Sequence, residues 1–396
     1  MPIRPTLRSD SDLIERWQQS PSHWITSPPE EHDSLAQWFE TTLTSDHAVT
    51  LTGSTPCNTP TCIIRSQRLP GDEHNAMICM TADPHGRDHE ELKKALHTAA
   101  DTLFTEGFCH SAVARINKSQ PASRRLFEEV GFVEHSSPEP VAALNDTTTY
   151  SLARTDFWRR VNGIKCLAII PARGGSKRIP RKNIRHFLGK PIISYSIEAA
   201  LSSGIFDRVV VSTDCAEIAE VARYLGADVP FLRPMEISDD TTPLINVLIH
   251  ALETVSPPDK PYTAACCLLP TAPFITAPLL TEGYRIMKHR HAPGAFTVTS
   301  FSSSIDRAFE IKDDGCLSMI WPDYEFTRSN DLPPAYHDAG QFYWVDPRSL
   351  LSERKVFLKG SAPIILPRDQ VQDIDTPEDW LMAELLMRGK HATHGV

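Results

Sequence analysis

The residues best suited to chemistry lie together in the segment AIIPARGGSKRIPRKN, residues 168–183. An apolar run leads into two glycines, Gly174 and Gly175, that are surrounded by arginine and lysine side chains. Glycines allow backbone N–H groups to approach an anion closely, and fixed positive charges neutralise it. Polyphosphate is the anion that suits such a loop best, so the segment predicts a binding site for a nucleoside triphosphate.

The spacing of this loop differs from that of the common phosphate-binding loops. It contains neither G-x-x-x-x-G-K-[ST] nor G-x-G-x-x-G, and a pair of glycines near cations is, taken alone, more often a solvated turn. The context favours a site, because residues 166–170 form the continuous apolar run of a parallel strand buried on both faces. In open α/β sheets, ligands bind beyond the carboxyl ends of the strands, where this loop begins.

Asp373 and Asp375 form the second group suited to chemistry. Thr376 and Pro377 are typical of a helix start, so the two aspartates lie in extended chain just before that helix. Side chains two residues apart in extended chain point the same way, while Ile374 between them faces the core. Two such carboxylates suit Mg²⁺, which takes one or two carboxylates together with substrate phosphates.

The alternative is that both acids only stabilise the positive end of the helix. A cationic, glycine-containing loop in the same domain favours the metal site. Nucleotidyl transfer needs cations for the triphosphate, a metal for the developing charge and a positioned nucleophile. The two segments together therefore predict a nucleotidyltransferase.

The elements that must position these groups alternate between strand and helix. Repeated strand–helix units predict an α/β domain with a mostly parallel, Rossmann-like sheet and helices on both faces. The segment 302–340 interrupts this alternation and is a candidate lid or partner-binding excursion. The predicted strands are 166–170, 208–213, 263–269, 295–300, 341–345 and 363–374, and the predicted helices are 191–203, 215–225, 243–255, 277–289 and 377–388.

The length and composition of the chain limit the classes of function. Its 396 residues favour two or three domains, and we place a first domain at 1–154, a linker at 155–163 and a second domain at 164–390. A net charge of −10 without a basic tract disfavours nucleic acid as a partner. No apolar run reaches the ~18 residues of a membrane span, and no signal-peptide pattern is present. The nine cysteines lack zinc-binding spacing, so we expect reduced thiols and a cytoplasmic protein.

The C-terminal half resembles the CMP-sialic acid synthetase family of cytidylyltransferases. The motifs that carry this resemblance are IPARGGSKRIPRKNI at 170–184, FDRVVVSTD at 206–214, LRP at 232–234, PTAPF at 270–274 and DIDTPEDW at 373–380. Within the family, YHDAGQFYW at 336–344 is most similar to the branch that activates pseudaminic acid. Synthetases for N-acetylneuraminate usually have Asn-Gly where this chain has Ala339 and Gly340, which disfavours that sugar. N-acetylneuraminate and legionaminic acid are the alternative substrates.

The resemblance implies a reaction in which CTP and a nine-carbon α-keto acid sugar give a CMP-sugar and pyrophosphate. It also implies a homodimer, in which residues 302–340 are a candidate interface. The triphosphate is expected to bind Arg173, Lys177, Lys182 and the loop residues Gly174, Gly175 and Ser176, and the cytidine side to be lined by Asn183, Arg233, Asp240 and Thr241. Mg²⁺ is expected to bind Asp373 and Asp375, and Asp375 is also a candidate proton acceptor. The sugar side is assigned to Gln341, with Phe342 and Tyr343.

The residues assigned to the sugar, and one further residue, also have purely structural interpretations. GQFYW at 340–344 is also a good strand, whose alternating aromatic residues would simply be core. Asp214, at the end of the FDRVVVSTD strand, would on the simplest interpretation only cap the following helix.

The N-terminal half resembles the GNAT-type N-acetyltransferases, an α+β fold. The resemblance rests on LRSDSDLIERWQ at 7–18, EEHDSLAQWFE at 30–40 and ASRRLFEEVGF at 122–132. The acetyl-CoA pyrophosphate loop of that family is degenerate here, because PHGRDHEEL at 84–92 keeps only Gly86 and Arg87 and adds acidic side chains. We therefore expect a domain without acetyl transfer; the alternative is a bifunctional enzyme that also N-acetylates a UDP-amino-sugar precursor.

Overall fold

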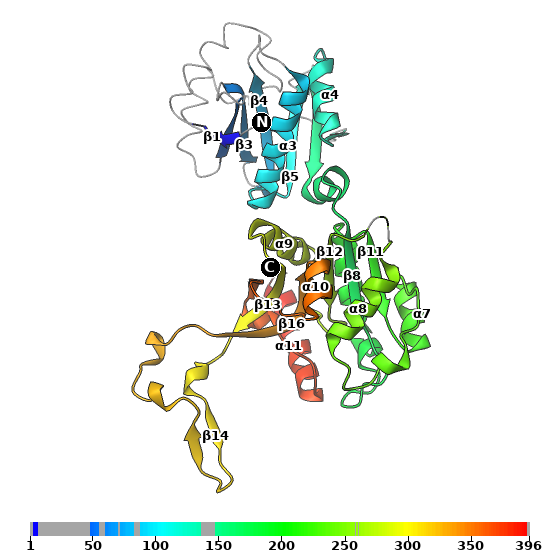
Figure 1. The fold of residues 1–396 in the computed structure, drawn as a ribbon, viewed down its shortest axis with the longest axis vertical. Helices are drawn as coiled ribbons and strands as arrows, with labels where there is room; N and C mark the ends of the chain where they lie inside the picture. The colour runs from blue at the N-terminus through cyan, green and yellow to red at the C-terminus, as the bar shows by residue number, and fades with distance from the viewer. Residues whose placement is uncertain are drawn as a thin grey trace. The chain divides into compact units, whose positions relative to one another are not determined.

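The chain divides into two compact units, Met1–Ile164 (unit 1) and Lys165–Val396 (unit 2), in the computed structural model (Figure 1). The structure describes residues 3–6, 48–54, 60–69, 72–82, 88–135, 147–257, 259 and 261–393. The segments 7–18 and 30–40, and residues 84–87 of the degenerate loop, lie outside this range. Within it, no helix is long and apolar enough to cross a membrane.

Unit 2 is built on a mostly parallel sheet, as predicted. Its strand β16 runs antiparallel to both of its neighbours, whereas the other adjacent strands are parallel. The strands lie in the order β11 (Arg208–Ser212), β8 (Cys166–Pro171), β12 (Ala264–Leu268), β16 (Tyr336–Val345), β13 (Gly294–Ser300) and β17 (Ala362–Leu366).

The helices of unit 2 cover both faces of this sheet. Helices α6 and α9 pack against each other and against the sheet, and α8 packs against β8 and α10. Side chains alternate along β16, so that Tyr343 and Val345 face α8 while Phe342 and Trp344 face α9. The helices are α6 (Ile193–Ser202), α7 (Ala216–Tyr224), α8 (Leu244–Val255), α9 (Ala277–His289), α10 (Pro347–Glu353) and α11 (Pro377–Thr393).

Two predicted boundaries of unit 2 were wrong. Pro191 does not begin a helix; it ends the short strand β10 (Lys190–Pro191), which pairs with β9 (His186–Phe187). The strand expected over 363–374 stops at Leu366, and a 3-10 turn, Arg368–Gln370, follows. The chain from this turn to α11, which carries the two aspartates, is therefore not part of the sheet.

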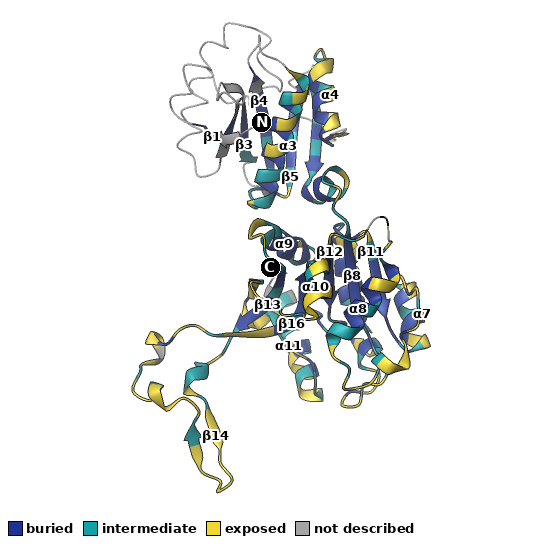
Figure 2. Ribbon diagram, in the orientation of Figure 1, coloured by how far each residue is buried: buried dark blue, intermediate teal, exposed yellow. Residues whose placement is uncertain are grey.

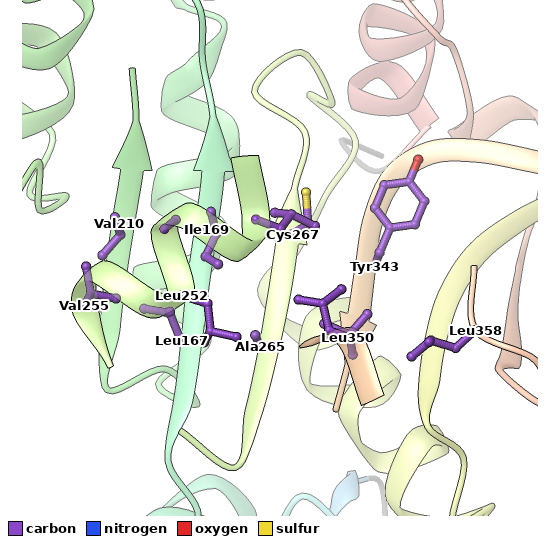
Figure 3. Close-up of a cluster of buried hydrophobic side chains, with 13 residues drawn as sticks. Leu167, Ile169, Val210, Leu252, Val255, Ala265, Cys267, Tyr343, Leu350 and Leu358 are labelled. Carbon is purple, nitrogen blue, oxygen red and sulfur yellow. The ribbon is translucent and has the colours of Figure 1, made fainter. Parts of the chain in front are cut away.

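Two hydrophobic clusters hold the elements that carry the predicted site. The larger joins α8 and α10 to the central strands and includes Leu167, Leu252 and Tyr343 (Figure 3). The smaller packs Ile374 and Trp380 against Ile179 and Phe187, so it ties the start of α11 to the loop after β8. Ile374 is fully buried, as predicted for the residue between the two aspartates.

The segment 302–340, which interrupts the alternation of strand and helix, extends away from the rest of unit 2; we call it the arm (Figure 1). It carries the hairpin β14 (Phe309–Ile311) and β15 (Leu317–Met319) and three 3-10 turns at Ile305–Arg307, Pro322–Tyr324 and Ser329–Asp331. Much of the arm is exposed (Figure 2). Large apolar side chains on it lie open to solvent: Phe309, Ile311, Leu317, Ile320 and Phe326.

Unit 1 is an α+β domain, the class expected for it. In its described part the strand order is β1 (Ile3–Pro5), β2 (Ala48–Ser54), β3 (Pro60–Leu69), β4 (Asp72–Ala82), β5 (Ser111–Asn117), β7 (Thr147–Ala153) and β6 (Val133–His135), with α3 (His89–Thr105) and α4 (Pro121–Glu129). The neighbours are antiparallel apart from β4 and β5.

The segment expected as a linker belongs to unit 1. A short helix, α5 (Arg154–Asp156), leads into a π-helix, Phe157–Val161. Phe157 and Trp158 are fully buried, and Asn162 donates a hydrogen bond to Asp101 on α3. These contacts fix residues 155–162 to the N-terminal core.

Candidate active site

A cleft of about 320 Å³ lies beyond the carboxyl end of β8. Apolar side chains from α8 and from the loop after β12 form part of its wall, including Val247 and Leu269. Eight of the predicted site residues line it: Arg173, Ser176, Lys177, Lys182, Asn183, Arg233, Asp240 and Asp375. Charges separated by about two hundred residues in sequence therefore share one cavity.

The glycine loop is held by a hydrogen bond to the neighbouring strand end. The Gly174 N–H donates to Asp214 Oδ1 at 2.8 Å. A Cβ added at Gly174 would lie 2.9 Å from Cys215 Cβ, so the close approach requires glycine. Asp214 is a site residue that sequence reasoning missed: Cys215, and not Asp214, occupies the N-cap of α7. Its place at the carboxyl end of a predicted strand was the available signal, whereas the position of that strand beside β8 is seen only in the structure.

Two residues that were predicted for the cytidine side are buried, and their side chains donate hydrogen bonds to the segments that form the cleft. Asn183 donates to the carbonyl oxygen of Arg173 at 2.9 Å. Arg233 donates to Ser238 Oγ at 3.2 Å and lies 3.7 Å from Asp214. Burial lowers the pKa of Arg233. Both side chains line the cleft while anchoring its walls.

Asp240 pairs with two of the predicted phosphate-binding cations. Arg173 and Lys177 both form ion pairs with its carboxylate. The hydrogen bond from Lys177 and, further, the charge of Arg173 hold the pKa of Asp240 below its usual value. Thr241 does not line the cleft; Thr242, which sequence reasoning missed, lines it together with Asp239, whose carboxylate accepts hydrogen bonds from both threonines.

Asp375 brings the predicted metal side into the same cleft. Its carboxylate lies 3.0 Å from Arg178 Nη2 and 3.3 Å from Lys182 Nζ. Lys182 also donates to the carbonyl oxygen of Ile374 at 2.7 Å, so it positions the segment that carries the aspartates. Arg178 was not assigned from the sequence, although it lies within the cationic loop.

The start of α11 fixes the backbone of Asp375. Asp379 accepts hydrogen bonds from the N–H groups of Asp375 and Thr376, at 3.0 and 2.7 Å. The Asp379 N–H donates to Thr376 Oγ1 at 3.2 Å, so Thr376 caps the helix as predicted and Asp379 makes the cap reciprocal. The cap stabilises the helix and, through it, the position of Asp375.

Asp373 lies beside the cleft without lining it. Asp373 is exposed to solvent, and desolvation by the surrounding chain together with the carboxylate of Asp375 raises its pKa. Gly340, in the left-handed region at φ 61°, faces Asp373: a Cβ there would lie 3.7 Å from Asp373 Cγ. A carboxylate whose pKa is raised by a neighbouring carboxylate favours a bound cation.

The donor set fits a magnesium ion that is completed by a substrate. Among residues 88–135, 147–257, 259, 261–393 and the shorter described segments, no group of three or more His, Cys, Asp or Glu side chains is arranged to hold a metal. Two carboxylates alone are what Mg²⁺ commonly takes from a protein when phosphates supply further oxygens.

The three residues predicted for the sugar side occupy different environments. Phe342 is core, packed against Gly283 of α9. Gln341 is 2 % exposed, and its amide donates to the carbonyl oxygen of Gln370 at 2.6 Å, so it ties β16 to the chain that leads to Asp373. Tyr343 lines a second cavity of about 460 Å³, which is mainly apolar. Its lining residues are Pro243, Leu244, Ile245, Asp338, Tyr343, Lys355, Val356 and Phe357.

The second cavity adjoins the cleft. Leu244 lines both, and Tyr343, Phe357 and Phe296 form an aromatic cluster in which the ring centroids of Tyr343 and Phe357 are 5.8 Å apart. Carbohydrates and their apolar substituents commonly pack on such rings. An apolar cavity with few polar groups therefore lies next to the charged cleft.

The N-terminus of α3, which follows the degenerate loop, carries the chain's own acidic groups. Asp88 Oδ1 accepts the N–H of Glu90 at 2.9 Å and so occupies the N-terminus of α3. Nearby, Glu129 pairs with Arg125, His89 and Lys93, which lower its pKa to about 2. Gln120, at the start of α4, accepts a hydrogen bond from Ser123. The carboxylates repel a pyrophosphate from the helix end that would otherwise attract it.

Acetyl-CoA is therefore expected not to bind unit 1. Isothermal titration of the full chain should give no saturable heat, whereas CTP with Mg²⁺ should give one in the same preparation. Stoichiometric binding of acetyl-CoA would contradict the expectation and revive the bifunctional alternative.

Comparison with known proteins identifies the family of unit 2. The family described as Cytidylyltransferase matches residues 167–361. A pseudaminic acid cytidylyltransferase of Campylobacter jejuni is 44 % identical over 228 residues, which cover 58 % of this chain and 98 % of the relative. The chain belongs to the cytidylyltransferase family. A CMP-N,N'-diacetyllegionaminic acid synthase of Legionella pneumophila is 32 % identical and covers 57 % of this chain and 97 % of its own.

The cytidylyltransferase match does not include unit 1, and for that part of the chain a solved structure of a different protein is similar. A crystal structure of spermidine N-acetyltransferase from Vibrio cholerae, in complex with CoA and spermine, is 16 % identical. It covers 40 % of this chain and 97 % of its own, with a TM-score of 0.34.

Proposed function

We propose that unit 2 transfers CMP from CTP to a nonulosonic acid, with pseudaminic acid as its main substrate. The observation that carries this proposal is the shared cleft, in which Asp375 lies with Arg173, Lys177 and Lys182. The choice of sugar is supported by the 44 % identity to the enzyme from Campylobacter jejuni. Legionaminic acid and N-acetylneuraminic acid are the alternative substrates, since relatives named for them are 32 % and 30 % identical.

One set of cleft residues binds the triphosphate of CTP, and another lies on the side of the cytidine. Arg173, Lys177 and Lys182 neutralise the triphosphate, and the Gly174–Ser176 backbone lets it approach closely. Their present partners, Asp240 and Asp375, are exchanged for phosphate oxygens when CTP enters. Arg233 and Asn183 anchor the wall on the cytidine side.

In the reaction, the anomeric hydroxyl of the sugar attacks the α-phosphorus of CTP in line. The new O–P bond forms as the bond to the β-phosphate bridge breaks, and pyrophosphate leaves with its electron pair. A carboxylate of the Asp373–Asp375 pair accepts the hydroxyl proton. Mg²⁺, held by Asp373 and Asp375 directly or through water, would stabilise the charge that develops on the pyrophosphate.

The second cavity is the proposed sugar site. Tyr343, Val356 and Phe357 provide an apolar surface for ring substituents, and Lys355 is a cation suited to the sugar's carboxylate. Gln341, first assigned to the sugar, acts instead by holding β16 to the chain before Asp373.

The decisive experiment is release of pyrophosphate by the purified chain from CTP and a panel of nonulosonic acids. Pseudaminic acid should give the highest kcat/KM, and omission of Mg²⁺ should remove the activity. Activity with none of the sugars, or equal activity with all of them, would reject the proposal.

The raised pKa of Asp373 predicts how the metal requirement depends on pH. Mg²⁺ binds the ionised carboxylate, and an acid with a raised pKa begins to take up protons at a higher pH than an ordinary aspartate. The Mg²⁺ concentration for half-maximal activity should therefore rise as the pH falls, before other carboxylates titrate. Asp373→Asn should need more Mg²⁺ at neutral pH and show a flatter profile. A wild-type Mg²⁺ requirement that depends on pH in the same way as that of Asp373→Asn would contradict this assignment.

We also propose that the arm mediates homodimerisation. Phe326 is 93 % exposed and Ile311 75 %, although side chains of this kind are normally buried. Sedimentation velocity should show a dimer, and the double variant Phe326→Asp and Ile311→Asp should sediment as a monomer. Tyr224→Asp, an equally exposed site on α7, is the matched control and should remain dimeric. A monomeric wild-type chain at tens of micromolar would exclude this interface.

The proposal for unit 1 is a structural or partner-binding role without acetyl transfer. We place the whole chain in the cytoplasm, where a nucleoside triphosphate is available. Most of the described cysteines are buried, as suits a reducing compartment.

A further inference from the structure

An irregularity in the pairing of β16 with β13 creates a polar group inside the second cavity. Phe296 pairs with Tyr343 and Val298 pairs with Asp338, so a two-residue step on β13 faces a five-residue step on β16. In a regular strand, residues five apart point to opposite faces. Here their partners are two apart and share a face, so the bulge places Asp338 and Tyr343 on the same face.

The consequence is a hydrogen-bonded pair that is held by its own strand. Tyr343 Oη donates to Asp338 Oδ2 at 2.7 Å, and the Gly340 N–H donates to Asp338 Oδ1 at 3.0 Å. Burial and the carboxylate of Asp338 raise the pKa of Tyr343, so its hydroxyl stays a donor. The Tyr343 oxygen points out of the apolar cluster (Figure 3). The carboxylate is thereby oriented before any ligand arrives.

Asp338 still has acceptor capacity toward the cavity. A carboxylate offers about four lone pairs, and the two hydrogen bonds use one on each oxygen. The residue is exposed and lines the second cavity, whose other walls are apolar apart from Lys355. The next strand residues lead to Gly340, which abuts Asp373. Asp338 therefore stands between the apolar cavity and the aspartate pair.

We propose that Asp338 is a specificity-determining residue for the sugar. Its free lone pairs accept a hydrogen bond from a donor on the sugar ring, an acylamino N–H, while the rings of Tyr343 and Phe357 pack against the acyl group. An acceptor-only carboxylate repels the sugar's own carboxylate, so it also fixes which way round the sugar enters. This inference rests on the proposed function, because it assigns the sugar to the second cavity.

The test separates sugar binding from nucleotide binding and from chemistry. Asp338→Asn keeps the size of the side chain and removes its charge; the KM for pseudaminic acid should rise about tenfold, the size of one hydrogen bond to a charged group. The KM for CTP and the Mg²⁺ requirement should stay within about twofold. Tyr343→Phe, which removes the donor that orients Asp338, should raise the same KM less. Asp313→Asn, in the turn of the arm hairpin, is the control and should leave all three constants unchanged.

Each other outcome overturns the assignment. An unchanged KM for the sugar in Asp338→Asn would show that Asp338 does not touch it. A changed Mg²⁺ requirement, or a lower kcat with an unchanged KM, would place Asp338 with the metal. If both variants lower the melting temperature and raise both KM values alike, the pair is only structural. Failure of the wild-type chain to use any nonulosonic acid would instead reject the proposed function, before any variant is compared.

Discussion

Replacement of Asp375 by alanine should abolish magnesium-dependent turnover while CTP still binds. We expect kcat to fall by about a thousandfold or more, since the variant loses a carboxylate of the proposed Mg²⁺ site, and a metal in such a site supplies several kcal/mol of transition-state stabilisation. The fold should survive, because the Asp375 side chain is 42 % exposed and pairs only with Arg178 and Lys182 among the ion pairs of the cleft.

The effect on CTP binding has the opposite direction, which makes the prediction specific. Without Asp375, Arg178 and Lys182 lose a competing carboxylate, so their charges are free for phosphate oxygens. The dissociation constant of CTP without metal should be unchanged or lower, as measured by calorimetry. Asp369→Ala, an exposed aspartate six residues earlier, is the control and should retain full activity. A kcat within tenfold of the wild type in Asp375→Ala would remove the metal assignment.

The parts of the fold that were predicted are those with a local cause. The apolar run at 166–170 is typical of a strand buried on both faces, and Thr376 supplies the hydroxyl that caps the following helix. Because the carboxyl ends of parallel strands meet at one edge of the sheet, a loop after such a strand and a segment before a C-terminal helix can share a cleft. The structure places Lys182 against Asp375 in this way.

The parts that were missed depend on how strands align with one another. Asp214 binds the Gly174 N–H because β11 lies beside β8, a neighbour relation that neither segment encodes alone. The role of Asp338 depends on the bulge opposite β13, since without it the side chain would face away from Tyr343. The family resemblance assigns Gln341 to the sugar; its burial and its hydrogen bond to the Gln370 carbonyl appear only in three dimensions.

Lys182→Met should have the second largest effect, because Lys182 serves both halves of the site. Its ammonium group donates to the Ile374 carbonyl at 2.7 Å and lies 3.3 Å from Asp375, which leaves a third donor for a phosphate. Methionine keeps the apolar length and removes the charge. We expect kcat/KM for CTP to fall by about a hundred- to a thousandfold, the usual cost of losing one preorganised donor to developing charge.

The comparison with Lys177 decides whether burial is the reason. The Lys182 side chain is 20 % exposed and that of Lys177 is 81 % exposed. Solvent and salt screen an exposed charge far more than a buried one, so Lys177→Met should cost about tenfold or less, and added salt should reduce the difference from wild type. The Lys182→Met defect should persist in high salt and should include a higher Mg²⁺ requirement, since the Asp373–Asp375 segment loses its tether. Equal defects in the two variants would mean that total positive charge, and not the placement of Lys182 against Asp375, drives catalysis.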